Sequence, residues 1–403
     1  MTAVSTLHTK GRGEKIALLS LVRDMDMGGL QTHIRVLSRQ LVKNGHKVIA
    51  LTGGGSLVRD LEREGVEHQF LSFNFNVFRL NKLKINPQTL SPEFNLLNLM
   101  NLVFLPFSLL RAVRISLTKK INIIHAHTTL CVLIGLITAK LLGIPFVVTL
   151  HHFQGLSLQL SFLLKKADRI IAVSQEIKEK IVKAGLNPHA VVVIPNMIDI
   201  DDHAKTAIDI PKLQQNSFKI VTVSRLDSMK TDVAQSLILC AERLVQEYPN
   251  MTIQVVIVGD GTEFNKIRNM ADEVNQKLGS QSIILTGYRK DAIRIISMGD
   301  IIVGAGRVVL EAMTVGKPII VATSKIHGIL TKATLPQIAK YNFSGRNSSK
   351  QTNSENTYQF ISKLIEDKPF RESAAAFSQE IIKKSYSTRA VVNRIQEVYK
   401  QLL

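Results

Sequence analysis

Short hydrophobic runs alternate with longer amphipathic stretches along most of the chain. Each short run is rich in Val, Ile and Leu at consecutive positions, which is typical of strands buried on both faces of a parallel sheet. The stretches between them have helix length, and strand–helix alternation of this kind predicts doubly wound α/β domains. The predicted strands cover residues 15–22, 46–52, 121–127, 145–151, 169–174, 190–196, 218–225, 253–260, 282–288, 300–306 and 317–323.

The alternation is interrupted near the middle of the chain. After "VIPNMIDIDD", the segment that ends at Ser217 is polar and contains Pro and Gln, which is typical of a linker. We therefore expect residues 1–200 and 201–385 to form two Rossmann-like domains. Sheets of this class bind ligands at the carboxyl ends of their strands, so two of them facing each other predict a cleft between the domains.

Composition is that of a globular protein, with 45% hydrophobic and 21% charged residues in 403. Cys131 and Cys240 stand in apolar stretches without metal or redox spacing, which indicates reduced core residues of a cytosolic protein. The N-terminus lacks the apolar core of a signal peptide. The uncharged run at residues 94–110 includes Pro106 and is shorter than the about 20 residues of a membrane span, so we expect a peripheral helix.

Positive charge is concentrated in the first half of the chain. The net charge is +19, and residues 1–196 hold 24 basic against 11 acidic residues. No nucleic-acid module is recognisable and aromatic residues make up 5%, which favours an anionic membrane surface over nucleic acid as a partner. Residues 77–122 hold seven basic residues and one acid, Glu93. This segment resembles an interfacial helix, although a helix that covers the sheet with a basic, solvated end fits equally well.

The stretch "VGAGRVVLEAM", Val303 to Met313, places two glycines before a helix that has no capping side chain. Its first amides are left for an external anion, and Gly304 and Gly306 permit close approach of a ligand. Glu311 falls about one turn beyond the amides of Arg307 and Val308, where it can accept hydrogen bonds from a ribose diol. A tight strand–helix turn with an exposed glutamate would give the same pattern.

Several other turns follow predicted strands and carry residues suited to chemistry. Arg225 ends one strand and Lys230 follows in the loop, and two cations there suit a diphosphate leaving group. Taken singly, each of these turns is also compatible with solvated cations, plain βα turns or a structural histidine, and "HAH" at 125–127 lacks the partners of a metal site. The other turns contain Gly28 and Gly29, His151, and Gly259 and Gly261.

In their order along the chain these motifs resemble those of the retaining GT-B glycosyltransferases of carbohydrate-active family four. The motif "GGLQTHIRVLSRQLVKNGHKV" is similar to the family's first loop and helix, and "SRLDSMK" and "VGDGTE" are similar to its Arg-Leu…Lys and Gly-Asp-Gly motifs. The most specific match is "GRVVLEAMTVGKPII", which resembles the donor-site signature. The resemblance implies two Rossmann-like domains that face each other across a cleft, with the C-terminal helix 386–403 crossing back to the first domain.

The resemblance also implies roles for individual residues. Arg225 and Lys230 would neutralise a nucleoside diphosphate, Glu311 would hold the ribose, and the amides after Gly306 would take a phosphate. The glycines of the 259–261 turn would lie beside the donor. His151 would face the transferred sugar, and Gly28 and Gly29 would line the acceptor and phosphate side. No cofactor or metal is implied beyond a UDP- or GDP-linked sugar donor.

The chain departs from the family pattern at four positions. Val303 stands where a second glutamate usually contacts the donor sugar, and Arg307 stands where an apolar residue is frequent. Ser224 and Thr231 replace glycines. Loss of one charged hydrogen bond costs roughly 1.5–3 kcal/mol, about tenfold to a few hundredfold in rate. Our hypothesis is that backbone amides of the Gly-Ala-Gly turn take over the sugar contact.

From this we expect a hexosyltransferase that moves a sugar to a glycan or lipid-linked acceptor in cell-envelope or surface polysaccharide synthesis. It would be cytoplasmic, and peripheral on the inner face of the cell membrane if the basic segment makes contact. Two alternatives stay open. A non-catalytic sugar-nucleotide-binding scaffold would explain Val303, and a UDP-sugar 2-epimerase would share the architecture but would need acidic groups that the sequence does not supply.

Overall fold

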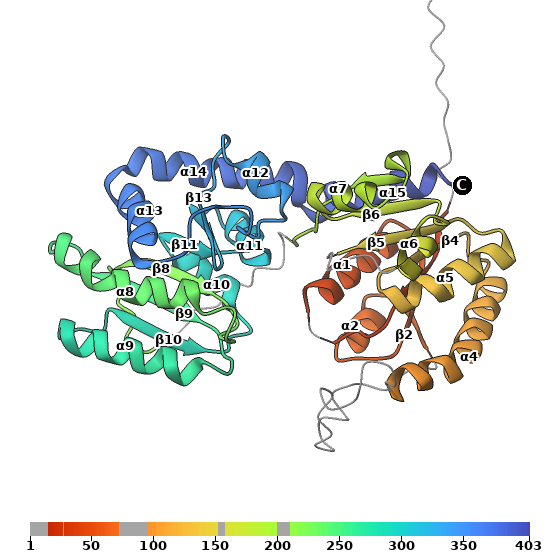
Figure 1. Ribbon diagram of the computed structural model, residues 1–403, viewed down its shortest axis with the longest axis horizontal. Coiled ribbons are helices and arrows are strands. Elements are labelled where there is room, and N and C mark those ends of the chain that lie inside the picture. Colours follow the sequence, from red (N-terminus) through yellow and green to blue (C-terminus); the bar gives the residue numbers. More distant parts are fainter. Residues whose placement is uncertain (1–14, 27, 72–95, 152–157, 200–209) are drawn as a thin grey trace, which may run out of the picture. The chain divides into compact units, whose positions relative to one another are not determined.

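The computed structural model describes all residues except 1–14, 27, 72–95, 152–157 and 200–209 (Figure 1). The chain divides into two compact units. Unit 1 contains the described parts of Met1–Val173, Ile177–Ile194 and Val392–Leu403. Unit 2 contains Ser174–Glu176 and the described parts of Pro195–Val391. The domain boundary expected at residue 200 lies outside the described residues.

Unit 1 is built on a seven-stranded parallel sheet with the strand order β3-β2-β1-β4-β5-β6-β7. Its strands are β1 (Ala17–Val22), β2 (Lys47–Thr52), β3 (Glu67–Phe70), β4 (Ile123–Ala126), β5 (Phe146–Leu150), β6 (Arg169–Ala172) and β7 (Val191–Val193). The helices between them are α1 (Gly29–Lys43), α2 (Val58–Arg63), α4 (Leu96–Thr118), α5 (Thr129–Leu142), α6 (Leu158–Leu164) and α7 (Gln175–Lys183).

Unit 2 has a six-stranded sheet with the order β10-β9-β8-β11-β12-β13, in which only β13 runs antiparallel. Its strands are β8 (Phe218–Val223), β9 (Ile253–Val258), β10 (Ile283–Gly287), β11 (Ile301–Gly304), β12 (Ile319–Ala322) and β13 (Ile326–Ile329). Its helices are α8 (Asp232–Glu247), α9 (Phe264–Leu278), α10 (Ala292–Met298), α11 (Arg307–Thr314), α12 (Leu335–Lys340), α13 (Ser354–Glu366) and α14 (Lys368–Ile381).

The prediction of two doubly wound α/β sheets is confirmed. All eleven predicted strands are present, and β3 and β13 are the two that the sequence pattern did not reveal. Both lie at a sheet edge, and the residues of β3 are only partly covered. The sequence "EHQF" of β3 is consequently polar, and Gly328 interrupts the apolar run in β13.

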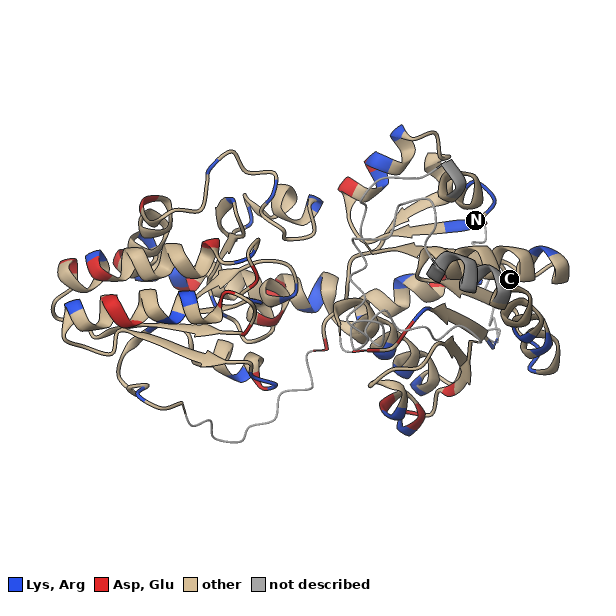
Figure 2. Ribbon diagram, turned by 60° about the horizontal axis from the view of Figure 1, so that its bottom comes forward, with Lys and Arg blue, Asp and Glu red and all other residues tan. Residues whose placement is uncertain are grey.

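Each sheet is apolar on both faces because successive side chains of a strand point to opposite sides. In β8, Ile220 packs into the cluster that contains α8 and α13, whereas Val221 packs into the cluster on the other face. Figure 2 shows the charged residues mainly on helices and in loops. Cys131 and Cys240 are free and buried in the cores of units 1 and 2, and burial raises the pKa of each thiol to about 12.

Helix α4 forms most of the described part of the basic segment, residues 77–122. Ala112 and Ile115 are buried in the core of unit 1, so this part of the helix is a domain helix that packs on the sheet. Residues 77–95 of the expected interfacial segment lie outside the described residues. Within the described ranges, no helix combines the length and the apolar character that crossing a bilayer requires.

The end of the chain packs into unit 1. Helix α15 (Thr388–Lys400) begins in unit 2, and its residues from Val392 onward belong to unit 1. The Tyr399 hydroxyl lies 2.6 Å from Nδ1 of His125, and Gln396 contacts His46. Tyr399 and His125 are fully buried, so this hydrogen bond satisfies two polar groups inside the sheet's core.

In unit 2 the turns after β8 and β9 are joined through their backbones. Three hydrogen bonds connect them, from Ser224 N to Val258 O, from Leu226 N to Asp260 O and from Glu263 N to Leu226 O, at 3.0, 2.9 and 2.8 Å. Gly259 has φ +147°, and a Cβ atom there would lie 1.7 Å from the Ser224 carbonyl oxygen. Only glycine therefore allows the two turns to approach this closely.

Acid should destabilise the protein through its buried histidines. Burial lowers the pKa of His125 to about 3, with like-charge repulsion from His33 as a smaller cause. Burial also lowers the pKa of His127 well below 6.5, and repulsion from His125, His151 and His33 adds to this shift. Because the unfolded chain then binds protons first, the free energy of unfolding should fall below about pH 6.5 by about 1.4 kcal/mol per pH unit for each such histidine. We expect His127→Gln to flatten this slope in urea denaturation between about pH 7 and pH 5. The exposed His189→Gln is the control, and equal slopes in both variants would contradict the prediction.

Gly259→Ala should be strongly destabilising because the new methyl group meets backbone atoms that cannot move independently. We expect a loss of about 3 kcal/mol or more. The matched control is Gly279→Ala, at the end of α9, where φ is +62° and no atom lies within 4 Å of the new Cβ. That variant should lose only about 1 kcal/mol, from backbone strain alone. Similar melting temperatures for both variants would show that the close approach is not essential.

Candidate active site

A cavity of about 800 Å³ opens at the carboxyl edge of the sheet in unit 2. It lies where parallel α/β sheets bind their ligands. Seven of the residues that the sequence analysis selected for donor binding or catalysis line it together, namely Arg225, Lys230, Gly259, Gly304, Arg307, Val308 and Glu311. Gly261 and Gly306 belong to the adjoining turns but do not line the cavity wall.

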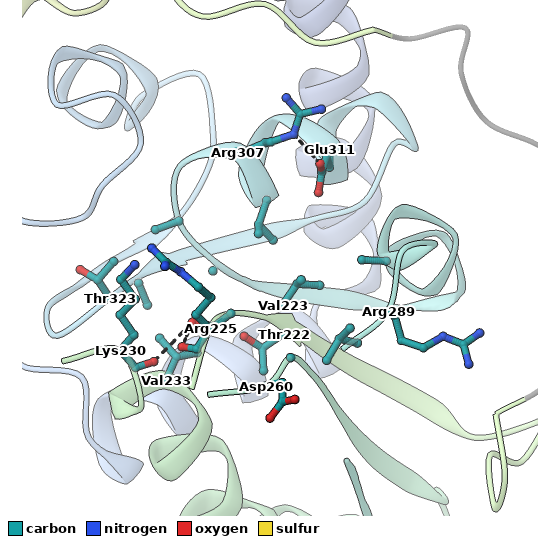
Figure 3. Close-up of a pocket in the computed structure, with 18 of the residues that line it drawn as sticks. Thr222, Val223, Arg225, Lys230, Val233, Asp260, Arg289, Arg307, Glu311 and Thr323 are labelled. Atoms are coloured by element: carbon teal, nitrogen blue, oxygen red, sulfur yellow. Dashed lines mark hydrogen bonds and ion pairs between the residues drawn. The ribbon is translucent and has the colours of Figure 1, made fainter. Parts of the chain in front are cut away.

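Arg225 and Lys230 lie in the loop between β8 and α8, with exposed side chains beside each other at one side of the cavity (Figure 3). No carboxylate pairs with either cation among the residues that the structure describes. The Ser224 hydroxyl donates to the Arg225 and Lys230 carbonyls, at 3.0 and 3.3 Å, and so ties the two ends of the loop together. The replacement of the family's glycine by serine therefore stabilises this loop.

Gly259 and Gly261 act on the site through the loop that carries Arg225. Their Cβ atoms would collide with the backbone of Ser224 and Leu226, at 1.7 and 2.6 Å. The Asp260 carboxylate between them accepts a hydrogen bond from the Gly261 amide. The sequence analysis assigned both glycines to donor contact. In the structure they allow the loop that carries Arg225 to pack directly against their turn.

Helix α11 begins without a side-chain cap, as the sequence predicted. Gly306 precedes it with φ 61° and ψ −122°, a conformation that side-chain-bearing residues rarely adopt. The Gly306 amide donates to the Phe343 carbonyl at 2.9 Å. This amide is therefore already used, which leaves fewer amides of the Gly-Ala-Gly turn for the sugar contact that we expected of them.

Glu311 is not an isolated carboxylate. Its Oε1 accepts a hydrogen bond from Nε of Arg307 at 2.8 Å, one helical turn before it (Figure 3). The side chain of Glu311 is 16% exposed and that of Arg307 is 42% exposed. Sequence reasoning noted both residues but did not foresee the ion pair, although the spacing of four residues is the usual one for such pairs in helices.

Val303 is fully buried in β11 and belongs to the apolar core of unit 2. Its register partner on β8 is Thr222, whose hydroxyl is buried without a hydrogen-bond partner among the described residues. Thr222 lines the cavity, so a polar group stands next to the position of the missing glutamate. Thr231, the other glycine replacement, has φ −90°, a conformation that needs no glycine.

The sequence analysis missed several residues of the cavity wall. They include Tyr288 and Arg289 after β10, and Thr323 and Ser324 after β12. Arg289 is held by two hydrogen bonds of 2.8 Å to Asp291, and its side chain points away from the other cations in Figure 3. The rule that drew attention to the ends of β8, β9 and β11 would have found these residues at the ends of β10 and β12.

The remaining predicted residues lie in unit 1. Gly28 and Gly29 open α1, and the Gly28 carbonyl accepts hydrogen bonds from the Thr32 amide and hydroxyl. His151 follows β5, and its Nε2 lies 3.4 Å from Nδ1 of His127. The His33 ring, from α1, packs edge to face on the His151 ring, with 5.1 Å between the ring centroids. Of these three, the sequence analysis proposed only His151 as a site residue, and it considered His127 only within the "HAH" motif that it rejected as a metal site.

These three histidines and His125 pack closely, and burial together with like-charge repulsion from the other three lowers the pKa of His127 well below its usual value. Nε2 of His127 is buried without a hydrogen-bond partner among the described residues. No three His, Cys, Asp or Glu side chains in the described part of the chain are arranged to hold a metal ion. The cluster is therefore a wall of closely packed histidine rings at the carboxyl edge of the sheet in unit 1.

Both halves of the chain match glycosyltransferase family models. The model described as Glycosyltransferase Family 4 matches residues 27–202, and the model described as Glycosyl transferases group 1 matches residues 217–336. These two matches cover most of the chain. The first reaches across unit 1, and the second includes the β8, β9 and α11 turns that form the cavity in unit 2.

Proteins of similar sequence carry the names of sugar transferases. One is a component of the phosphatidylinositol N-acetylglucosaminyltransferase of Homo sapiens, 29% identical over 286 residues, which are 68% of this chain and 52% of that protein. The GPI3 component of the Saccharomyces cerevisiae enzyme of the same name is 25% identical over 415 residues, 97% of this chain and 83% of that protein. The UDP-Gal:alpha-D-GlcNAc-diphosphoundecaprenol alpha-1,3-galactosyltransferase of Escherichia coli is 29% identical over 252 residues, 56% of this chain and 64% of that protein. The chain thus spans about half the length of the human relative.

Solved structures share the fold over nearly the whole chain. The structure of Anabaena HepE in complex with UDP and glucose has a TM-score of 0.66 and 19% identity, covering 96% of this chain and 100% of that one. A UDP-N-acetylglucosamine 2-epimerase has a TM-score of 0.58 and 14% identity, covering 96% and 98%. At these identities the likeness concerns the fold alone. This likeness and the two parallel sheets show the GT-B fold, and the two family matches together show that the chain is a glycosyltransferase of the family-four type.

Proposed function

We propose that this glycosyltransferase uses a UDP- or GDP-linked sugar as its donor and binds it in the cavity of unit 2. The observation that carries the proposal is the set of groups around that cavity. Two cations without carboxylate partners among the described residues, an uncapped helix start and a carboxylate on that helix line one space of about 800 Å³. Diphosphate, phosphate and ribose diol are the parts of a sugar nucleotide that these groups bind.

The Arg225 and Lys230 side chains promote departure of the nucleoside diphosphate. Negative charge grows on the leaving phosphate as the glycosidic bond breaks, and positive groups already in place stabilise that charge without reorganisation. The amides at the start of α11 add the positive end of the helix dipole. Glu311 accepts hydrogen bonds from the ribose hydroxyls and so fixes the nucleoside relative to the two cations.

Transfer proceeds with retention at the anomeric carbon and without a metal ion. The bond to the leaving phosphate breaks first, through an oxocarbenium-like state, and the acceptor hydroxyl attacks from the same face. We assign no carboxylate of the cavity wall as the general base. In this route a leaving-phosphate oxygen takes the proton of that hydroxyl instead. Arg225 and Lys230 supply the positive charge that a divalent ion supplies in metal-dependent transferases. His151 faces the transferred sugar, and Gly28 and Gly29 line the acceptor side.

The acceptor is a glycan or a lipid-linked sugar. The names of the relatives support this choice, since they describe transfer to phosphatidylinositol and to a diphosphoundecaprenol-linked sugar. Synthesis of envelope or surface polysaccharide is the process that we propose for such an acceptor, on the cytoplasmic side of the membrane.

Helix α4 supplies the contact with an anionic membrane. Phe107, Leu110 and Leu117 are 59%, 67% and 61% exposed, and Arg111 and Arg114 lie exposed among them. These spacings of three and four residues place the five side chains on one face of the helix. Apolar side chains interleaved with arginines fit the boundary between acyl chains and anionic headgroups.

Arg225→Ala and Lys230→Ala should each lower turnover about 100-fold or more, because each removes a cation that stabilises the leaving group. The assay is nucleotide release from a panel of UDP- and GDP-linked sugars with acceptor, with and without EDTA. Lys266→Ala, an exposed lysine of α9 outside the cavity, is the control. Near-normal turnover in both variants would refute the mechanism.

The same assay separates the alternatives. Tight binding of the sugar nucleotide without turnover would identify a scaffold, and formation of an epimeric sugar nucleotide would identify an epimerase. Loss of activity in EDTA would refute metal independence, and inversion at the anomeric carbon of the product would refute retention.

Flotation with liposomes tests the membrane contact. We expect the protein to float with liposomes that contain anionic lipid and to lose most of that binding in a Leu110→Glu, Leu117→Glu variant. Leu239→Glu changes a leucine of α8 that is similarly exposed, at 56%, and should float like the wild type. Absence of flotation with any lipid would leave a soluble acceptor, and equal flotation of all three proteins would exclude α4 as the contact.

A further inference from the structure

Arg307 is a cation of the cavity wall that pairs with a carboxylate of the same wall. Its Nε lies 2.8 Å from Oε1 of Glu311, and both side chains line the cavity. Arg289 is instead held by Asp291, outside the wall. Figure 3 shows the Arg307–Glu311 pair on α11 above the strand ends. In the free protein, therefore, the carboxylate proposed for the ribose already accepts a charged hydrogen bond at Oε1.

The placement of Arg307 is unfavourable for the helix itself. It is the first residue of α11, where the helix dipole presents positive charge, and no acidic residue lies in the first turn. An arginine that precedes its glutamate by four residues is also the weaker order of such a pair. Local rules of this kind are broken mainly where a ligand supplies the compensation, and the compensation required here is negative charge.

The pair is able to exchange partners. Arg307 is partly solvated, and solvent-exposed ion pairs contribute little to stability, so the energy needed to separate it from Glu311 is small. A diphosphate beside the helix start offers two charged groups in place of one carboxylate oxygen, and guanidinium binds phosphate through two parallel hydrogen bonds.

We propose that Arg307 is a further donor-binding residue that exchanges Glu311 for the diphosphate when the donor enters. The guanidinium then joins Arg225 and Lys230 on the diphosphate, and the freed carboxylate accepts the ribose hydroxyls. This inference rests on the proposed function. It makes the diphosphate the part of the ligand that frees both oxygens of Glu311 for the ribose, whereas a nucleoside without phosphates either shares the carboxylate with Arg307 or displaces it without a compensating contact.

Binding of UDP and uridine, or of GDP and guanosine if the wild type prefers guanine, tests the exchange by calorimetric titration. Arg307→Leu should weaken binding of the diphosphate about 10-fold or more, through loss of a charged hydrogen bond. Binding of the nucleoside should stay equal or become about twofold tighter, because Glu311 is then free. Arg307→Lys, which keeps the charge but not the planar fork, should lie between the two proteins.

Arg268→Leu removes an exposed arginine of α9 outside the cavity and should leave both affinities unchanged. A purely structural role of Arg307 would weaken diphosphate and nucleoside alike, and that result would overturn the proposal, as would an unchanged diphosphate affinity. Thermal melting of each variant separates misfolding from loss of binding. If the wild type binds no nucleoside diphosphate at all, the proposed function falls, whereas normal wild-type binding with an unaffected Arg307→Leu overturns only the exchange.

Discussion

The approach of Gly259 to the Ser224 carbonyl is the constraint on which the donor cavity depends. A side chain at residue 259 would lie 1.7 Å from that oxygen, so the β8 and β9 turns meet only because this position lacks one. Three backbone hydrogen bonds then join the turns. The loop that carries Arg225 and Lys230 is built on this junction, and the Ser224 hydroxyl connects its two ends. The side chains of both cations are exposed, but the backbone of their loop is held in place by these hydrogen bonds.

On the opposite side of the cavity the geometry is set by one glycine and one ion pair. Gly306 adopts a conformation that turns β11 directly into α11 without a capping side chain. The helix start therefore remains open to an anion, while Arg307 and Glu311 hold each other. The cavity wall contains four cations, Arg225, Lys230, Arg289 and Arg307, against two carboxylates, Asp260 and Glu311, so it favours an anionic ligand before any ligand is present.

In unit 1 the corresponding constraint is the burial of polar histidine rings at the edge of an apolar sheet. His125 is satisfied by Tyr399 and Thr149, whereas His127 contacts mainly other histidines. Tyr399 comes from the last helix of the chain, so the C-terminus completes the core of the first unit.

The alternation of short apolar runs with helix-length amphipathic stretches predicted the fold class, because strands of a parallel sheet are buried on both faces and are joined by helices. The motifs at the strand ends located the cations and Glu311, since parallel strands bring their carboxyl ends to one edge. Strands β3 and β13 were missed by the same reading, because β3 is polar and partly buried and the four residues of β13 are interrupted by His327 and Gly328. Tertiary structure alone decided that Gly259 supports the Arg225 loop, that Thr222 stands beside Val303, and that three histidines far apart in sequence converge. Contacts between segments that are far apart in the sequence depend on how the elements pack in three dimensions, and local sequence patterns do not contain that information.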